Sequence, residues 1–439
     1  MLKSIGVLSL VVVCFLVHDL HAQQAPAYAI KNVIIHSDDQ DPYSGHIVWR
    51  NGTITSMGRD ISIPFDAKIT DGGDSLHVYP GFIDGSSTFG TPEPPRRQER
   101  PPRPGEPTYE RAGIQPDRSP SDLLDASDKT LITLFNNGFT VGAVGLKGNM
   151  LPGSVDVYVI DRERTDRYLV KSGIAQKYQF TGAQGVYPST LMAIMAKTRQ
   201  LWYEAEALNN HIRLFNSNPS GYDTPNRDLV LEALIPVIRK EQPLFVHVDS
   251  KDDILRVFSL QDELGFNLVL VSAKEAYQLV DEIKRRNISV LASISLSDKP
   301  DQDTKNGTDS ELSDEEVKFR STQMLAWERE RDNIKVLVDA GIRVGFSLND
   351  LDPSKFVEKI RQISESGLND NQILGLLTTN TAQILGINGN FGALKPGYHA
   401  NMNVYSGPLT HSDSTLLFVS NGNELKEISS SKAQPRGRR

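Results

Sequence analysis

Residues 78–90 read VYPGFIDGSSTFG, an apolar run that changes into a short series of hydroxyl side chains. Alternation along a strand places residues i and i+2 on one face, so Ser86 and Thr88 are predicted to project to the same side. That geometry suits a pair of metal ligands, but neutral hydroxyls are poor ligands beside imidazole or carboxylate. The stretch therefore places two hydroxyl side chains at a spacing that suits paired ligands, although hydroxyl groups do not hold a metal ion well.

The first residues of the 439-residue chain have the pattern of a secretory signal peptide. Lys3 precedes an apolar run at residues 5–17, and Ala22 is a suitable small residue for cleavage. The run is too short to span a bilayer, so we expect a secreted or periplasmic chain with no membrane association after cleavage. Cys14, the only cysteine, lies inside this segment, which excludes disulfides and thiolate ligands from the mature protein.

The net charge of −8 gives no reason to expect a nucleic-acid partner. Residues 23–79 alternate short apolar runs with turn residues, and Asn51-Gly52 is typical of a hairpin turn. Residues 387–428 have a similar strand pattern with glycine and proline between the strands. We therefore expect a composite β-sandwich domain built from both ends of the chain.

Residues 80–386 alternate helical and strand-type segments, including a long helix expected at residues 314–340. Repeated units of this kind require a parallel sheet, either open or closed as a TIM-like (β/α)8 barrel. Three segments fall outside this scheme. We expect a mobile Pro/Arg-rich loop at residues 91–119, an acidic, solvated connection at residues 298–316 and a basic tail at residues 429–439.

Several separated phrases resemble the amidohydrolase superfamily of metal-dependent hydrolases. They are NGTITSMG, IPFDAKITDG, VYPGFID, PLFVHVDS, LLTTNTAQILGI and FGALKPGYHANMNV, in the family's order and spacing. The resemblance implies an α/β fold, with a TIM-like (β/α)8 barrel over residues 80–386 and a small β-sandwich from both termini. By family, the chain would hydrolyse non-peptide C–N bonds such as those of cyclic amides.

Carried over residue by residue, most metal ligands of the family are replaced. The resemblance places the fifth-strand histidine at His247, which is either a residual metal ligand or an interior histidine retained from an ancestral site. The family's catalytic aspartate falls on Asn349, or on Asp350 if the eighth strand carries a bulge. Lys177 is a candidate for the family's carboxylated lysine. The substituted ligand positions are Ser86, Thr88, Ser272 (or its neighbour Ala273) and Asn349.

The family mechanism needs a metal-bound water and a carboxylate that shuttles its proton. One imidazole beside an amide does not hold two metal ions, so we expect no binuclear centre, and a single divalent metal such as zinc stays open. Three hypotheses follow: an active hydrolase with a remodelled site, a pseudoenzyme that binds a small molecule, and a non-catalytic subunit that pairs with a competent homologue. A homo-oligomer is also open. The substitutions favour loss of the ordinary metal-dependent activity.

Overall fold

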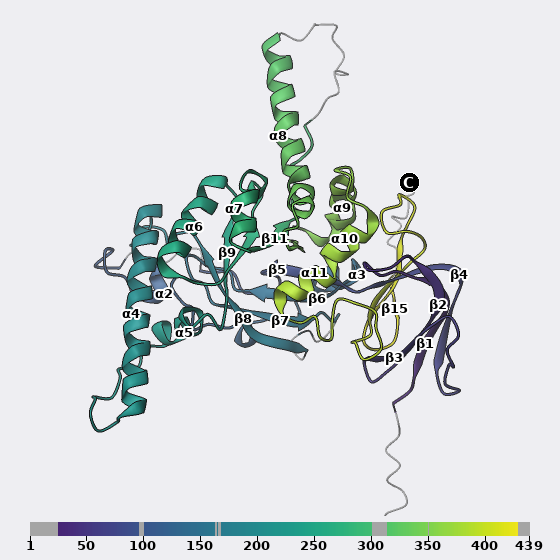
Figure 1. Ribbon diagram of the computed structural model, residues 1–439, viewed down its shortest axis with the longest axis horizontal. Coiled ribbons are helices and arrows are strands. Elements are labelled where there is room, and N and C mark those ends of the chain that lie inside the picture. The colour runs from purple at the N-terminus through teal and green to yellow at the C-terminus, as the bar shows by residue number, and fades with distance from the viewer. Residues whose placement is uncertain are drawn as a thin grey trace, which may run out of the picture.

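The structure is a computed structural model that describes residues 25–95, 101–162, 165, 168–300, 314–349 and 351–428. It contains one seven-stranded and one eight-stranded sheet, with most helices gathered around the larger sheet (Figure 1). The fold is therefore mixed α/β. The signal segment, Asp350 and the basic tail, on which three of the sequence predictions fall, lie outside the described residues, as does most of the acidic connection.

The smaller sheet combines strands from both ends of the chain. In spatial order these are β15 (Lys426–Glu427), β14 (Leu416–Asn421), β13 (Asn401–Tyr405), β4 (Lys68–Pro80), β1 (Tyr28–Ile35), β2 (Tyr43–Arg50) and β3 (Thr53–Gly58). The hairpin predicted at Asn51-Gly52 is confirmed, because β2 pairs antiparallel with β3 and both turn residues have positive φ, 51° and 77°. The C-terminal strands join the sheet where β13 pairs antiparallel with β4.

The larger sheet follows the order of the chain from one edge to the other. Its strands are β5 (Phe82–Ser87), β6 (Phe139–Gly145), β7 (Ser154–Val159), β8 (Leu169–Gln179), β9 (Leu244–Val248), β10 (Leu268–Ser272), β11 (Ser289–Ser293) and β12 (Val344–Ser347). Strands such as β6 and β10 are buried along their whole length. Burial on both faces explains why these strands read as continuous apolar runs in the sequence.

One strand of this sheet departs from the predicted parallel arrangement. β7 pairs antiparallel with both β6 and β8, whereas the other neighbours in the sheet pair parallel. Residues 146–153 and 160–168 are the short connections that join β7 to its neighbours. The physical reason is length, because antiparallel strands can be joined by a short turn but a parallel pair needs a long crossover.

The edge strands β5 and β12 lie against each other without forming a ladder of paired residues within the described ranges. The Leu348 N–H donates to Asp84 Oδ1 over 2.9 Å. The Ser347 hydroxyl and the Asn349 N–H both donate to the Ser86 carbonyl oxygen, over 2.7 and 3.2 Å. The sheet therefore curves until its edges touch, but it is not a closed barrel of paired strands.

The helices mostly connect consecutive strands of the larger sheet. Their bounds are α2 (Tyr109–Ala112), α3 (Lys129–Asn136), α4 (Leu191–Ser217), α5 (Leu229–Ile238), α6 (Lys251–Leu264), α7 (Val280–Arg285), α8 (Asp314–Asp339), α9 (Phe356–Ser364), α10 (Asp370–Leu377) and α11 (Thr379–Leu385), with short 3-10 turns η1 (Pro120–Asp122), η3 (Ala276–Gln278) and η4 (Pro353–Lys355). The long helix predicted at residues 314–340 is confirmed as α8, which stands out from the body beside β11 (Figure 1). Across the described ranges, no helix combines the length and apolar character that a bilayer span requires.

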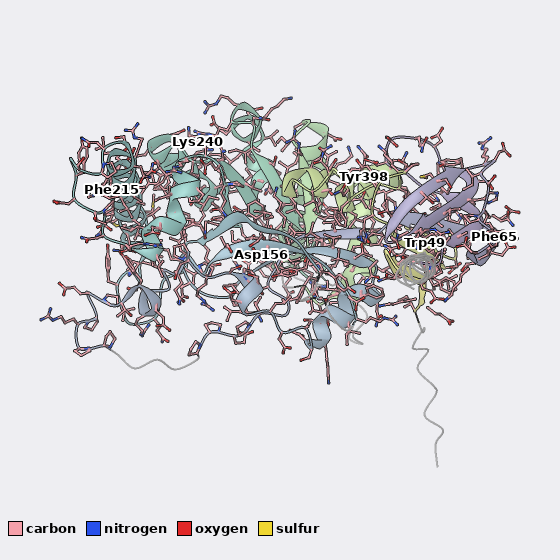
Figure 2. The ribbon with its side chains drawn as sticks, turned by 90° about the horizontal axis from the view of Figure 1, so that it is seen from below. Trp49, Phe65, Asp156, Phe215, Lys240 and Tyr398 are labelled. Atoms are coloured by element: carbon pink, nitrogen blue, oxygen red, sulfur yellow. The ribbon has the colours of Figure 1, made fainter. Side chains whose placement is uncertain are left out.

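The segment expected to be a mobile loop, residues 91–119, is packed over its described part from residue 101. Ile114 is fully buried and forms a bridge with Leu151. The Ser119 hydroxyl donates over 2.7 Å to the buried carboxylate of Asp156, which lies in the middle of the protein (Figure 2). The average composition of residues 91–119 did not reveal these contacts, because they are made by Ile114 and Ser119 in the second half of the segment.

Candidate functional site

The carboxyl ends of β8, β9, β10 and β12 surround a cavity of about 350 Å³. In sheets of parallel strands, this end is where binding and catalytic side chains gather. The lining is mostly polar, so the cavity suits a polar ligand. Its residues are Lys177, Gln179, Phe180, Thr181, His247, Val248, Asp249, Asp253, Ser272 and Asn349.

A chain of hydrogen bonds runs along the cavity and joins three of the residues that the sequence resemblance placed at ligand positions. The Ser272 hydroxyl donates to Asp249 Oδ1, and the Asn349 amide donates to Ser272 Oγ over 3.1 Å. The Asn349 side chain also hydrogen-bonds His247, whose Nε2 lies 3.4 Å from Ser86 Oγ. The polar groups of this network are therefore partnered by one another.

The imidazole of His247 is held in its neutral form. Burial lowers the pKa of His247 well below its ordinary value of 6.5, and the nearby Lys177 cation lowers it further. The hydrogen bond to Asn349 opposes this shift but is the smallest of the three effects. A neutral imidazole carries one hydrogen-bond donor and one acceptor at neutral pH, so His247 can recognise polar groups of either kind.

Strained backbone positions lie at the same strand ends. Ser272, Ala273 and Asn349 have positive φ values of 71°, 49° and 45°. Residues other than glycine adopt a positive φ at a cost of about 1 kcal/mol or more each, and such backbone strain concentrates at functional sites. The turn at the end of β10 lets the Ala273 N–H donate to the Val248 carbonyl over 2.7 Å. The strained turn thereby fixes Ser272 beside β9.

The structure brings most of the predicted site residues together. Ser86, His247, Ser272 and Asn349 share one network, and Lys177 lines the same cavity with its Nζ donating to the Leu146 carbonyl over 3.3 Å. Asp350, the alternative to Asn349, lies outside the described residues.

Thr88, predicted to project to the same side as Ser86, lies just beyond the end of β5 and does not line the cavity itself. β5 ends at Ser87, so the strand alternation does not extend to Thr88. Thr88 lines an adjoining hollow of about 500 Å³ instead.

Two residues of the site escaped the sequence reasoning. Asp84 is buried, and its Oδ1 accepts hydrogen bonds from the Ser86 and Leu348 backbone N–H groups, over 3.3 and 2.9 Å. It therefore links β5 to the residue after β12. Gln179 lines the cavity two residues beyond Lys177. Strand alternation could have predicted that Gln179 projects to the same side as Lys177. No local signal could have predicted the role of Asp84, because its partner Leu348 lies 264 residues away in the chain.

The side chains present do not match the metal centre of the family. Across the ranges that the structure describes, no group of three or more His, Cys, Asp or Glu side chains could hold a metal ion. The cavity offers one imidazole, while Ser86, Ser272 and Asn349 supply hydroxyl and amide groups, which are weak ligands for zinc. The only carboxylate in the network, that of Asp249, accepts the Ser272 hydroxyl. The described donors therefore do not fit a binuclear centre.

Solved structures identify the class of fold to which this arrangement belongs. An amidohydrolase from Thermotoga maritima matches 91% of this chain and 100% of its own length, with 21% identity and a TM-score of 0.74. A prolidase complexed with N-methylphosphonate-L-proline matches 91% and 99%, with 14% identity and a TM-score of 0.53. An adenosine deaminase from Xanthomonas campestris with bound zinc matches 92% and 94%, with 11% identity and a TM-score of 0.50.

These similarities show that the chain has the amidohydrolase-superfamily fold, as the sequence resemblance predicted. The identities are low, so the similarity concerns the fold. No protein-family model matches the chain, and no curated protein sequence matches it.

Proposed function

We propose that this chain is a secreted or periplasmic amidohydrolase-superfamily protein that binds a small polar ligand and has lost metal-dependent hydrolysis. One observation carries the proposal: Ser86, Ser272 and Asn349, at former ligand positions, hydrogen-bond within one network around His247. Groups that satisfy one another in this way stabilise the cavity without a metal ion. The signal-like segment at residues 1–22 supports the location.

The fold supports the same proposal. We take the eight-stranded sheet as the counterpart of the family's TIM-like barrel, and the seven-stranded sheet as the counterpart of its β-sandwich, with boundaries near residues 80 and 386. The bonds that link β12 to Asp84 and Ser86 of β5 support this assignment, because they lie where a barrel would close.

The ligand would occupy the cavity at the strand ends and exchange hydrogen bonds with neutral side chains. His247 supplies a neutral imidazole, and Asn349 and Gln179 each supply an amide oxygen as an acceptor, because the Gln179 N–H₂ already donates to the Gly148 and Asn149 carbonyls and the Asn349 N–H₂ to Ser272 Oγ. Lys177 adds a cation to the same wall. This set of side chains suits a small molecule that carries an amide. An amide is also the group that a C–N hydrolase recognises.

Hydrolysis of C–N bonds is the second candidate, because the solved neighbours include an amidohydrolase and a prolidase. It would use His247 with at most one divalent metal, or act beside a competent homologue as a paired subunit. In this reading, Asn349 or Asp350 would take the place of the family's proton-shuttling aspartate.

Metal analysis of the mature protein tests the proposal. The chain from residue 23 onward would be produced with added zinc, manganese or iron, purified without chelators and analysed by plasma mass spectrometry. We expect far less than one ion per chain, and no turnover of cyclic amides or dipeptides. A control variant, His247→Asn, identifies any ion held at the cavity. About one or two ions per chain that disappear in this variant, together with turnover, would establish the hydrolase instead.

A further inference from the structure

The first half of α8 projects away from the body of the protein (Figure 1). Every residue from 315 to 323 is exposed, and the first buried side chain of the helix is that of Trp327. Within the described ranges, the hydrogen bonds and ion pairs that join α8 to other elements also begin at Trp327, whose Nε1 donates to the Ser297 carbonyl over 3.0 Å. Short isolated helices are marginal in water, because packing supplies most helical stability. The projecting turns would therefore gain stability from a partner that covers one of their faces.

One face of this part of α8 has apolar side chains near its centre and opposite charges at its ends. Residues spaced alternately by three and four along a helix form one stripe. Phe319 and Leu325 lie on such a stripe and are 64% and 47% exposed. The exposed stripe, all of whose members are exposed, consists of Glu315, Lys318, Phe319, Thr322, Leu325, Ala326 and Arg329.

The exposed stripe is symmetric about Thr322. Phe319 and Leu325 stand about 4.5 Å before and after Thr322 along the helix axis, and Glu315 and Arg329 about 10 Å before and after it. A two-fold axis at Thr322 would set Phe319 level with Leu325 of an antiparallel second copy. The same axis would set Glu315 level with Arg329. Each contact would occur twice, as in any interface between identical surfaces.

The charges at the two ends of the exposed stripe favour this antiparallel arrangement. Within the described ranges, Glu315 and Arg329 form no ion pair or hydrogen bond. Glu330, which follows Arg329 in the chain, lies 3.0 Å from Lys274 Nζ instead. A parallel pair of helices in register would set like charges against each other at both ends, which costs binding energy. The antiparallel pair sets opposite charges against each other at both ends.

The middle of the exposed stripe allows two helices to approach closely. The Thr322 hydroxyl donates to the Lys318 carbonyl over 2.8 Å, so it brings no unpaired donor into the contact. Ala326 is small. Because α8 joins the body only from Trp327 onward, the two bodies would lie at opposite ends of the paired helices.

We propose that the exposed stripe is the interface of a homodimer, in which two copies of the chain pair their α8 helices antiparallel about Thr322. Stable interfaces bury about 1,600 Å² in total, and four turns of one helix provide less than that. We therefore expect a dissociation constant on the order of micromolar. The cavity at His247 takes no part in the contact, so the proposed function neither requires the dimer nor depends on it.

Sedimentation of the full mature chain over about 1–200 μM measures the dissociation constant. Phe319→Glu should raise this constant at least about tenfold, because it places a carboxylate in the apolar contact twice. Phe65→Glu is the matched control. It makes the same change at a fully exposed phenylalanine outside α8, and it should leave the constant unchanged.

Exchange of the end charges tests the antiparallel register. Glu315→Arg and Arg329→Glu should each raise the dissociation constant about five- to tenfold, because each sets like charges against each other. The double variant should restore the dissociation constant of the wild type, because it re-forms both opposite-charge pairs with their signs reversed. A general effect of charge on the helix would not be reversed in this way.

Thiol cross-linking tests the position of the two-fold axis. Cys14 is the only cysteine, so the chain from residue 23 onward contains none. Thr322→Cys would place two thiols opposite each other at the axis, and mild oxidation should link the two copies. Gln323→Cys introduces a thiol at an exposed position beside the stripe and should stay unlinked under the same conditions.

A chain that sediments as a monomer at the highest concentration would overturn the inference. So would a dimer that Phe319→Glu leaves unchanged, or one that is linked as readily through Gln323→Cys as through Thr322→Cys. All substituted positions are exposed, so each variant should keep the melting temperature of the wild type when both are diluted to the monomer.

Discussion

Asp156 is expected to be the most costly single carboxylate to remove, because it organises β7, β8 and the start of η1. It is fully buried. Its oxygens accept from five groups: the Ser119 hydroxyl (2.7 Å), the Ser121 N–H (3.1 Å), the Tyr158 hydroxyl (3.4 Å), the Ser172 hydroxyl (3.0 Å) and the Gly173 N–H (2.7 Å). The same strand β8 carries Lys177 and Gln179 to the candidate site, so this anchor also positions the cavity wall.

The magnitude follows from the donors that Asp156→Ala would leave. Hydroxyl groups can rotate toward other acceptors, but a backbone N–H cannot. Losing the acceptor of the Gly173 N–H costs about 2 kcal/mol, and losing that of the more exposed Ser121 N–H about 1 kcal/mol. We therefore expect a decrease of about 3 kcal/mol in the free energy of unfolding. For this chain of 439 residues, the decrease lowers the melting temperature by about 3 °C.

Urea unfolding followed by tryptophan fluorescence measures this effect. Asp156→Asn keeps the shape of the side chain but places an amide N–H₂ opposite hydrogen-bond donors. It should therefore lower the free energy of unfolding by at least half as much as Asp156→Ala does. Asp66→Ala, which breaks a surface ion pair with Arg50, is the matched control and should cost about 1 kcal/mol or less. An Asp156→Ala variant whose unfolding free energy lies within about 1 kcal/mol of the wild type would refute the argument.

Two further predictions concern pH and close packing. Burial and a neighbouring histidine lower the pKa of His36 from 6.5 to about 4. Between pH 6.5 and pH 4, the unfolded chain therefore binds a proton at His36 that the folded chain does not bind. The free energy of unfolding is highest above pH 6.5 and falls by about 2 kcal/mol as the pH is lowered toward 4, after allowance for partial exposure. Urea unfolding at several pH values should show a smaller decline in His36→Asn than in the control His211→Asn, which removes a half-buried histidine of α4. A Cβ at Gly85 would lie 2.6 Å from the Phe346 carbonyl oxygen, so Gly85→Ala should separate β5 from β12 and cost about 1–3 kcal/mol. Gly389→Ala, where an added Cβ meets no atom within 4 Å, should be neutral in the same unfolding measurement, and equal stability of the two variants would contradict this account.

Local signals predicted the elements whose formation depends on neighbouring residues. Asn51-Gly52 can adopt positive φ at both positions, so the hairpin between β2 and β3 was readable in the sequence. Helix α8 was predicted from the alternation of helical and strand-type segments, and it ends shortly before Gly341, whose φ is 76°. The antiparallel strand β7 was missed, because apolar alternation does not reveal strand direction.

The sequence by itself predicted that hydroxyl and amide side chains, those of Ser86, Ser272 and Asn349, stand at positions where the family resemblance implies metal ligands. Only the tertiary structure decided what these groups do. Ser86 and His247 are 161 residues apart, and Ser272 and Asn349 are 77 apart, yet each pair is in hydrogen-bonding contact. Chain separation carries no information about such contacts, because they form only when parallel strands bring their carboxyl ends to one edge of the sheet.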